Sequence, residues 1–510
     1  MRFGDLVAND AISLSLAKGE ILALLGENGA GKTTLMNILF GHYKADDGTV
    51  EVHGKQLPPG KPRAAIDAGV GMVHQHFTLA GNLTVLDNIT LGSERLSAPT
   101  SGRRAARKKL LALADRFGLP INPDARVASL SVGERQRVEI LKALYRDASI
   151  LILDEPTAVL ARPEAEKLFI TLREMAADGL SIIFISHKLH EVMAGSDRVT
   201  VLRGGKVVAE RKTTDTSPQE LAELMVGRQV TRPKREVQQS GEPVLIAKDV
   251  CVGPPEARAL DGLTLDVRAG EILGIVGVSG NGQAALGGLL SGLELPSAGT
   301  LHVRGDDGAL IDLGNLAPRE RVRLGIGRVP EDRHAEGVVG DLSVWENAVL
   351  EQLRSRRFSS LGFIRQASGR QHAQNLIDTY DIRGAGPATR TRLLSGGNMQ
   401  KLILGRVLEA RPRFLFANQP TRGLDEGAIA AVHGHLLKAR QQGAAVLLIT
   451  EELEEATALA DRVQAMVKGK LSAPVASEDI DAQTLGLMMA GQWDAVPDRD
   501  AGPQGKSHAA

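Results

Sequence analysis

The sequence predicts an α/β fold built from two tandem domains. The chain has 510 residues, which is more than a single hydrophobic core usually serves. The stretch KGEILALLGENGAGKTTLMNILFG (18–41) is repeated as AGEILGIVGVSGNGQAALGGLLSG (269–292), at a constant offset of 251. Both copies run from an apolar strand pattern through a glycine-rich turn into a helix, an order typical of α/β domains that bind phosphate groups.

The repetition continues further along the chain. LSVGERQRVEILKALYR (130–146) corresponds to LSGGNMQKLILGRVLEA (394–410), and Pro156 corresponds to Pro420, both at an offset of 264. These fixed offsets indicate a duplicated domain that gained about 13 residues between the two blocks. We therefore expect domains at 1–230 and 244–493. The polar stretch 231–243, with its Pro and Gly, reads as a linker, and 494–510 as a disordered tail.

Composition excludes several classes of function. Lys+Arg and Asp+Glu both number 61, and aromatic residues make up 3% of the chain, so neither a basic footprint nor a base-stacking platform is predicted. The single cysteine, Cys251, excludes an intrachain disulfide framework and is expected to be a small buried side chain. We find no secretory signal and no apolar run of about 20 residues, so a role at a membrane would need partner proteins.

The first glycine-rich turn has the pattern of a working phosphate-binding loop. Glycines let backbone N–H groups close around phosphates, and the start of the following helix adds its positive dipole. Lys32 is expected to reach the β- and γ-phosphates, and the Thr33 hydroxyl to hold Mg²⁺. The predicted nucleotide-binding residues of this loop are Gly26, Glu27, Asn28, Gly29, Ala30, Gly31, Lys32, Thr33 and Thr34.

Three further residues follow predicted strands and complete a candidate catalytic set. ASILILDEP (148–156) ends in Asp154, expected to support Mg²⁺, and Glu155, expected to polarise the attacking water. Adjacent acids at a strand end can also cap a helix, but their pairing with the phosphate loop favours catalysis. His187 follows LSIIFIS (180–186) and Gln75 lies in MVHQHF (72–77). Both are candidates for contact with the γ-phosphate, and Gln75 also for contact with the metal.

Two other short motifs are less specific. LSVGERQ (130–136) begins a predicted helix, where Ser131, Gly133 and the first backbone amides are expected to form an anion-binding site. RRAARKK (103–109) is most simply the solvated face of a helix, with contact to anionic lipid as the alternative.

The order of these motifs resembles the nucleotide-binding domains of ATP-binding-cassette proteins. The order is phosphate loop, Gln75, LSxG, acid pair and His187, and the resemblance covers nearly the whole chain twice. It implies two tandem phosphate-loop NTPase domains, each with a mixed sheet core and a helical subdomain, that use ATP and Mg²⁺. Tandem cassettes without membrane segments resemble the fused ATPase subunits of bacterial importers for simple sugars and nucleosides. The stretches 71–89, 130–146 and 329–337 are most similar to the nucleoside-uptake branch.

This resemblance also implies partners and a location. We expect two integral-membrane permease subunits and an extracytoplasmic solute-binding protein, with this chain peripheral on the cytoplasmic face of the membrane and no nucleic acid. Segments 77–85 and 332–344 are candidate permease contacts, because Phe77, Leu79 and Trp345 read as exposed apolar residues; ordinary packing between subdomains is the alternative. The sequence does not identify the transported solute.

One departure from the family lies at the N-terminus. Phe3 stands where the family has an aromatic residue that stacks on adenine, but the strand before it is missing. Either the native start is longer or this domain has an uncovered sheet edge.

In this family two cassettes meet head to tail, and each ATP lies between the phosphate loop of one and the LSGG helix of the other. For the first site, the opposite wall would come from Ser395, Gly396, Gly397 and Asp425. For the second site, the required residues are replaced: Gln283 stands for Lys32, Ala284 for Thr33, Glu331 for Gln75, Asn418 and Gln419 for the acid pair, Glu451 for His187, Val132 for a glycine and Ala161 for Asp425. We expect one competent composite site and one degenerate site, and leave open whether the latter binds ATP.

Two other functions fit the sequence less well. A soluble tandem-cassette ATPase acting on ribosomes or DNA usually has two intact sites and a long charged arm, neither of which this chain has. A pseudoenzyme that binds nucleotide without turnover is disfavoured by Lys32, Asp154 and Glu155.

Overall fold

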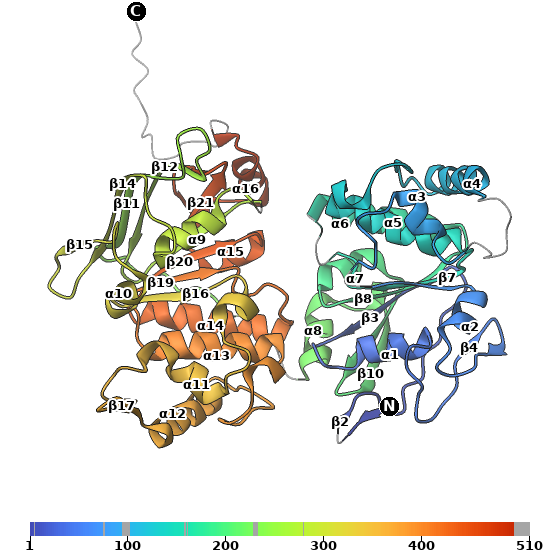
Figure 1. The fold of residues 1–510 in the computed structure, drawn as a ribbon, viewed down its shortest axis with the longest axis horizontal. Helices are drawn as coiled ribbons and strands as arrows, with labels where there is room; N and C mark the ends of the chain where they lie inside the picture. The colour runs from blue at the N-terminus through green and yellow to red at the C-terminus, as the bar shows by residue number, and fades with distance from the viewer. Residues whose placement is uncertain are drawn as a thin grey trace, which may run out of the picture. The chain divides into compact units, whose positions relative to one another are not determined.

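The computed structural model describes residues 1–4, 6–74, 77–93, 102–157, 160, 162–227, 233–278 and 280–493. The predicted tail at 494–510 lies outside these residues. The chain divides into two compact units, unit 1 built on residues 1–230 and unit 2 built on the residues that follow. Figure 1 colours unit 1 from blue to green and unit 2 from yellow-green to red.

Unit 1 is organised around a six-stranded mixed sheet. Five strands are parallel, and the edge strand β10 is antiparallel to β9. In spatial order the strands are β10 (Lys206–Lys212), β9 (Arg198–Arg203), β3 (Ile21–Gly26), β8 (Ser181–Ser186), β7 (Ile150–Asp154) and β6 (Val70–Val73). Two-residue hairpins are formed by β1 (Arg2–Phe3) with β2 (Leu6–Val7), and by β4 (Glu51–Val52) with β5 (Lys55–Gln56).

Helices cover both faces of this sheet, so the central strand β3 is buried throughout. Successive side chains of a strand point to opposite faces. Accordingly Ile21, Ala23 and Leu25 join one apolar cluster, and Leu24 joins the other. The helices are α1 (Lys32–Leu39), α2 (Pro62–Asp67), α3 (Val85–Thr90), α4 (Arg103–Arg116), α5 (Val132–Tyr145), α6 (Arg162–Ala177), α7 (Leu189–Gly195) and α8 (Pro218–Val226).

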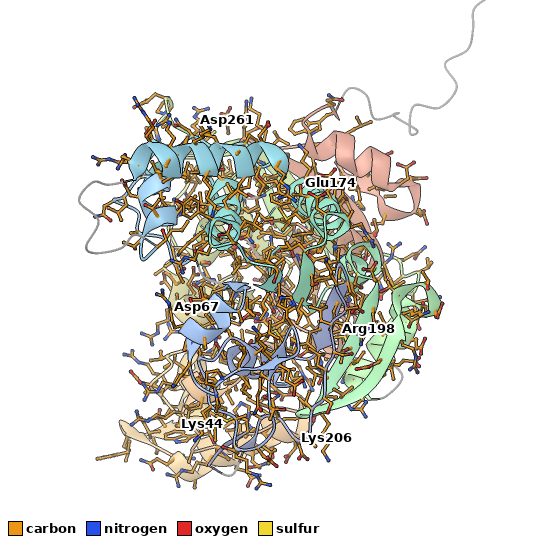
Figure 2. All side chains as sticks on the ribbon, turned by 90° about the vertical axis from the view of Figure 1, so that its right-hand side faces the viewer. Lys44, Asp67, Glu174, Arg198, Lys206 and Asp261 are labelled. Carbon is orange, nitrogen blue, oxygen red and sulfur yellow. The ribbon has the colours of Figure 1, made fainter. Side chains whose placement is uncertain are left out.

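Unit 2 repeats this sheet order. Its strands run β16 (Ile326–Val329), β19 (Phe414–Asn418), β20 (Ala445–Thr450), β13 (Ile272–Val276), β21 (Arg462–Val467) and β22 (Lys470–Leu471), with β23 (Val475–Ala476) also paired to β21. The helices are α9 (Gln283–Ser291), α10 (Pro318–Arg323), α11 (Val344–Val349), α12 (Gln366–Thr379), α13 (Gly396–Glu409), α14 (Glu426–Gln441), α15 (Leu453–Leu459) and α16 (Ala482–Met489). The strand-end contacts repeat as well: Arg198 binds Glu20 in unit 1 (Figure 2 labels Arg198), and Arg462 binds Glu271 in unit 2.

Unit 2 has an additional antiparallel sheet that the described part of unit 1 lacks. It is formed by β12 (Leu260–Arg268), β11 (Pro243–Val252), β14 (Ala298–Arg304) and β15 (Leu310–Asp312). The offset of 251 aligns β12 with residues 9–17, which form no strand.

Each unit also has a helical part, as the resemblance implied. In unit 1 it contains α3, α4 and α5, and in unit 2 α11, α12 and α13, with a small hairpin of β17 (Ser359–Ser360) and β18 (Phe363–Ile364). Between the units, residues 233–241 form neither helix nor strand.

The expectation of exposed apolar residues after Gln75 and Glu331 is wrong, because none of the three side chains is fully exposed and Phe77 is half-buried. Trp345 is buried in the main apolar cluster of unit 2, and Leu79 packs against the cluster of unit 1. A Cβ on Gly369 would lie 2.8 Å from the Trp345 ring, so α12 approaches the indole closely because it has a glycine there. Cys251 is buried, as expected.

The basic run of α4 is a solvated helix face with acidic partners. Arg103 pairs with Asp87, Arg107 with Asp124 and Lys109 with Asp147, in each case through partly exposed side chains. These ion pairs favour the simpler interpretation over contact with lipid. In the part of the chain that the structure describes, no helix has the length and apolar character needed to span a bilayer.

Candidate active site

The phosphate loop of unit 1 lies between β3 and α1, as predicted. Gly29 and Gly31 adopt φ angles of 86° and 97°, a region that glycine enters without strain. A Cβ on Gly31 would lie 2.2 Å from the Ala8 carbonyl oxygen, so the loop closes against the N-terminal segment. The buried Asn9 supports it there by donating from Nδ2 to the Gly31 carbonyl at 3.0 Å.

Lys32 is buried at the start of α1 and is held over the loop. Its Nζ donates to the carbonyl oxygens of Gly26 at 2.7 Å and Glu27 at 2.9 Å. Burial lowers the pKa of Lys32, although the negative charges of Glu155 and Asp154 oppose this change. An ammonium group that is poorly solvated and set among backbone amides is well suited to contact phosphate oxygens.

The acid pair and His187 lie at neighbouring strand ends. Asp154 ends β7 and is buried, while His187 directly follows β8. The Nδ1 of His187 lies 3.1 Å from Oε1 of Glu155. Burial raises the pKa of Glu155, but the hydrogen bond and charge of His187, together with Lys32, outweigh it, so the pKa lies below its ordinary value. Glu155 is thus held as a carboxylate, which is the form that accepts a proton.

The backbone of Glu155 is in the left-handed region, with φ at 46°. Its N–H donates to the carbonyl of Ile185 at 3.1 Å, which extends the pairing of β7 and β8 by one residue. Strained conformations of non-glycine residues are characteristic of functional sites. Gln419 in unit 2 has φ at 49° and an equivalent bond to Ile449, so the duplicate retains the backbone while lacking the acid.

The residues present fit a magnesium–nucleotide complex. Thr33 is exposed on the first turn of α1, and Asp154 supplies a carboxylate. No group of three or more His, Cys, Asp or Glu within the described residues could hold a metal alone. Mg²⁺ commonly takes one or two protein ligands and completes its shell with phosphate oxygens and water, which suits this sparse set. Gln75, predicted to contact metal and phosphate, lies outside the described residues, as does Ala161.

Phe3 lies in β1 and is 45% exposed, with its ring edge-to-face against Tyr43 at 5.7 Å between centroids. Its predicted stacking on adenine stays a prediction.

In unit 2 the side chain of Gln283 forms hydrogen bonds with the backbone of the equivalent loop. The Oε1 of Gln283 accepts from the backbone N–H of Asn281 at 3.0 Å, and its Nε2 donates to the Val278 carbonyl at 3.0 Å. Glu331, which replaces Gln75, forms an ion pair with Arg422, so its negative charge is partly neutralised within the unit. Asn418 is buried in place of Asp154, and Glu451 is exposed in place of His187.

The two LSxG segments cap equivalent helices. Ser131 accepts from the N–H of Glu134 at 3.3 Å at the start of α5, and Ser395 accepts from that of Asn398 at 3.4 Å at the start of α13. Gly396 and Gly397 form the first turn of α13, and Asp425 directly precedes α14.

The family model described as "ABC transporter" matches residues 9–158 and 260–422, one block in each unit. The chain belongs to the ABC transporter family. This ABC ATPase is 44% identical to the glucose import ATP-binding protein TsgD13 of Haloferax volcanii, over 97% of this chain and 95% of the relative. It is also 44% identical to the nucleoside import ATP-binding protein NupA of Lactococcus lactis subsp. cremoris, over 96% of each chain.

Among solved structures, this ABC ATPase is similar to the archaeal ribosome recycling factor aABCE1, crystallised with a ribosomal stalk protein. The TM-score is 0.61, with 18% identity over 93% of this chain and 89% of the other. At this identity the likeness shows the fold alone. The predicted fold, two ABC cassettes with mixed sheets, is confirmed by the two matched blocks and the sheets described above.

Sequence reasoning missed a second layer of residues beneath the acid pair. Thr157, Ser186 and Glu191 are each at most 3% exposed, and the hydroxyls of Thr157 and Ser186 both donate to the Glu191 carboxylate. A signal was present in the repeat, because Thr157 recurs as Thr421 and Glu191 as Glu455 at the offset of 264.

Proposed function

We propose that this ABC ATPase powers the import of nucleosides or simple sugars through separate permease subunits. The observation that carries the proposal is the 44% identity, over nearly the full length of both cassettes, to proteins named for nucleoside and for glucose import. The motifs at 71–89 and 329–337 favour nucleosides, whereas the equal identity to a glucose importer keeps sugars as the second candidate.

We further propose that unit 1 supplies the only hydrolytic residues. Lys32 and the loop amides would bind the phosphates, while Asp154 and Thr33 would hold Mg²⁺, which offsets phosphate charge when bound. Glu155 would accept a proton from the attacking water, and His187 would orient Glu155 and contact the γ-phosphate. The site would be completed by Ser395, Gly396, Gly397 and Asp425 of unit 2, and Gln75 would join it from the segment outside the described residues.

The distribution of residues between the units supports this arrangement. Unit 1 retains every residue that a phosphate loop needs, and unit 2 retains the LSGG segment and Asp425 that would face it. Conversely, unit 2 lacks Lys, Thr, both acids and His at its own loop, and unit 1 has Val132 and Ala161 where an intact partner would need Gly and Asp. Each unit has kept what one site requires and changed what the other requires.

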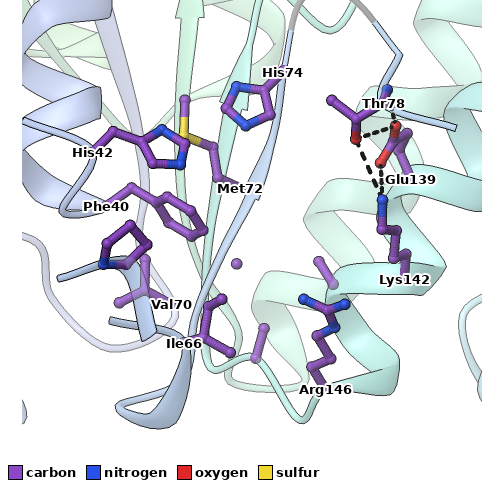
Figure 3. A pocket seen from close by; sticks show the side chains of 14 residues that line it. Phe40, His42, Ile66, Val70, Met72, His74, Thr78, Glu139, Lys142 and Arg146 are labelled. Carbon is purple, nitrogen blue, oxygen red and sulfur yellow. Dashed lines mark hydrogen bonds and ion pairs between the residues drawn. The ribbon is translucent and has the colours of Figure 1, made fainter. Parts of the chain in front are cut away.

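We propose that a permease segment docks at a cavity beside segment 77–85. The cavity has a volume of about 250 Å³ and lies between the sheet edge and the helical part of unit 1 (Figure 3). Apolar and aromatic side chains form one wall, among them Phe40, which directly follows α1, Ile66 of α2 and Met72 of β6. The opposite wall is polar, with Arg146 and a buried Glu139 that accepts from the N–H and hydroxyl of Thr78. Apolar and charged walls facing one another suit the end of an amphipathic helix.

The same proposal implies an extracytoplasmic solute-binding protein and a peripheral location at the cytoplasmic face of the membrane. The experiment that tests it is co-purification of the chain with candidate permease subunits, followed by reconstitution of the complex in lipid vesicles that contain the candidate binding protein. Nucleosides are expected to stimulate ATP hydrolysis and to accumulate on the trans side. Stimulation by sugars alone would indicate that sugars, and not nucleosides, are the transported solutes. Failure of the chain to assemble with any permease would contradict the import function.

A further inference from the structure

We propose that Glu191 is a positioning residue for hydrolysis in unit 1. Its buried carboxylate ties the turn that carries Glu155 to the strand end that carries His187. The inference rests on the roles proposed above for Glu155 and His187, and neither the sequence motifs nor the comparisons assign a role to Glu191.

The geometry joins two strand ends through one carboxylate. Oε1 of Glu191 accepts from the Thr157 hydroxyl at 2.5 Å, and Oε2 accepts from the Ser186 hydroxyl at 2.6 Å. Thr157 lies two residues after Glu155, and Ser186 directly precedes His187. A shift of either strand end relative to the other would therefore break a hydrogen bond to a buried charged group, which is costly.

The burial of Glu191 makes these bonds strong constraints. The side chain is 2% exposed and comes from α7, which follows His187 after a single residue. Its charge is offset by Lys188, whose Nζ lies 3.5 Å from Oε1. A carboxylate that is buried, charge-paired and bonded through both oxygens has little freedom to move. It is suited to hold the left-handed turn at Glu155 and the 3.1 Å contact with His187 in place.

Unit 2 provides an internal comparison. Glu455 corresponds to Glu191, and its Oε1 accepts from Thr421 at 2.8 Å and contacts the buried His433 at 3.0 Å. Its Oε2, however, is buried without a hydrogen-bond partner among the described residues. The hydrogen bond from the threonine of the turn to the carboxylate is thus present in both units. The hydrogen bond from the strand end to the carboxylate occurs only in unit 1, where the strand leads to His187.

Ser186 at the end of β8 and Thr450 at the end of β20 occupy equivalent positions and differ by one hydrogen bond. The hydroxyl oxygen of Ser186 accepts from the N–H of Lys188, and that of Thr450 accepts from the N–H of Glu452, both at 3.0 Å. Only Ser186 also donates to the carboxylate. A purely structural role for this hydroxyl would be common to both units, so the additional bond indicates a function confined to unit 1.

The test compares Ser186→Ala with Thr450→Ala in the full-length chain. Both variants remove the same local bond to the backbone, but only Ser186→Ala releases the carboxylate. We expect Ser186→Ala to lower kcat for ATP about tenfold or more, with KM for ATP within about twofold, because misplacement affects the reacting geometry more than ground-state binding. Thr450→Ala is expected to leave kcat within about twofold.

Thr157→Val and Glu191→Asp keep the inference testable if Ser186→Ala folds poorly. Thr157→Val has nearly the same shape and should also lower kcat at constant KM, whereas Glu191→Asp retains a carboxylate and should hydrolyse faster than Glu191→Gln. Equal kcat in Ser186→Ala and Thr450→Ala, or loss of nucleotide binding in step with kcat, would overturn the inference. Glu155→Gln in the same series separates the two proposals, since normal turnover in that variant would refute the role of Glu155 itself.

Discussion

The Nδ1 of His187 lies 3.1 Å from Oε1 of Glu155, so two side chains that follow neighbouring parallel strands meet at one edge of the unit 1 sheet. In unit 2 the position of Glu155 holds Gln419, a neutral amide that cannot act as a base, and the position of His187 holds Glu451 in place of an imidazole. The asymmetry between the duplicated units is therefore concentrated where the chemistry would occur.

Lys32→Ala is expected to abolish ATP hydrolysis and uptake. The ammonium group is buried over the loop, and without it the phosphates would meet only neutral donors. Steady-state phosphate release measures the effect. The matched variant Gln283→Ala should retain turnover, and Gln283→Lys should not restore it to Lys32→Ala because the acids are still absent from unit 2. Turnover in Lys32→Ala would refute a single hydrolytic loop.

Glu155→Gln is expected to lower kcat by about 10²–10³ while ATP still binds, because the variant removes the proton acceptor and keeps the loop. A fluorescent ATP analogue measures the binding. The reciprocal change Gln419→Glu serves as the control and should add no turnover, since Lys32 and Thr33 have no counterparts in unit 2. A gain of activity in Gln419→Glu would show that the second site is closer to competence than we propose.

The lowered pKa of Glu155 predicts a particular dependence of stability on pH. Because the pKa is lower in the folded chain than the ordinary value of 4.5, the ionised group favours the folded state above that value, and the contribution is lost as pH falls through the folded pKa. Calorimetry of wild type and Glu155→Gln from about pH 4 to about pH 8 should show a constant difference in melting temperature near neutrality. Below the ordinary pKa of 4.5, the melting temperature of the wild type should fall relative to that of Glu155→Gln. A rise relative to Glu155→Gln would mean that folding raises the pKa of Glu155.

Ile66→Glu is expected to reduce uptake and association with the permease subunits. The substitution places a charge on the apolar wall of the cavity in unit 1, away from Lys32 and Glu155. Basal ATP hydrolysis of the isolated chain should change by less than about twofold, as for surface substitutions remote from the chemistry. Arg63→Glu, on the exposed side of the same helix, is the control. Normal uptake with Ile66→Glu would place the permease contact elsewhere.

Much of the fold and the phosphate loop was predictable because the chain contains two copies of the same domain, which can be compared with each other. The offsets of 251 and 264 located Lys32, Glu155 and His187 together with their replacements, and the structure brings those three side chains of unit 1 together. Period-2 and period-3.6 patterns identify strands and helices because they report which faces are buried.

What sequence did not predict depends on contacts between distant positions. Trp345 read as exposed, but it is buried against Gly369, and that glycine has no local signature. Glu331 was placed by sequence only as the replacement of Gln75, and its pairing with Arg422, 91 residues away, appears only in the fold. Glu191 belongs to none of the sequence motifs, because only the fold brings Thr157 and Ser186 to its two oxygens.

The most direct test of the central claim compares kcat in Ser395→Ala and Ser131→Ala. Both serines cap the first turn of their helices, at 3.4 Å and 3.3 Å, so the loss of the cap should cost each helix about 0.5–2 kcal/mol alike. If ATP is hydrolysed between the loop of unit 1 and the LSGG segment of unit 2, Ser395→Ala will lower kcat strongly and Ser131→Ala will change it little. Equal losses, or a larger loss in Ser131→Ala, would contradict the account.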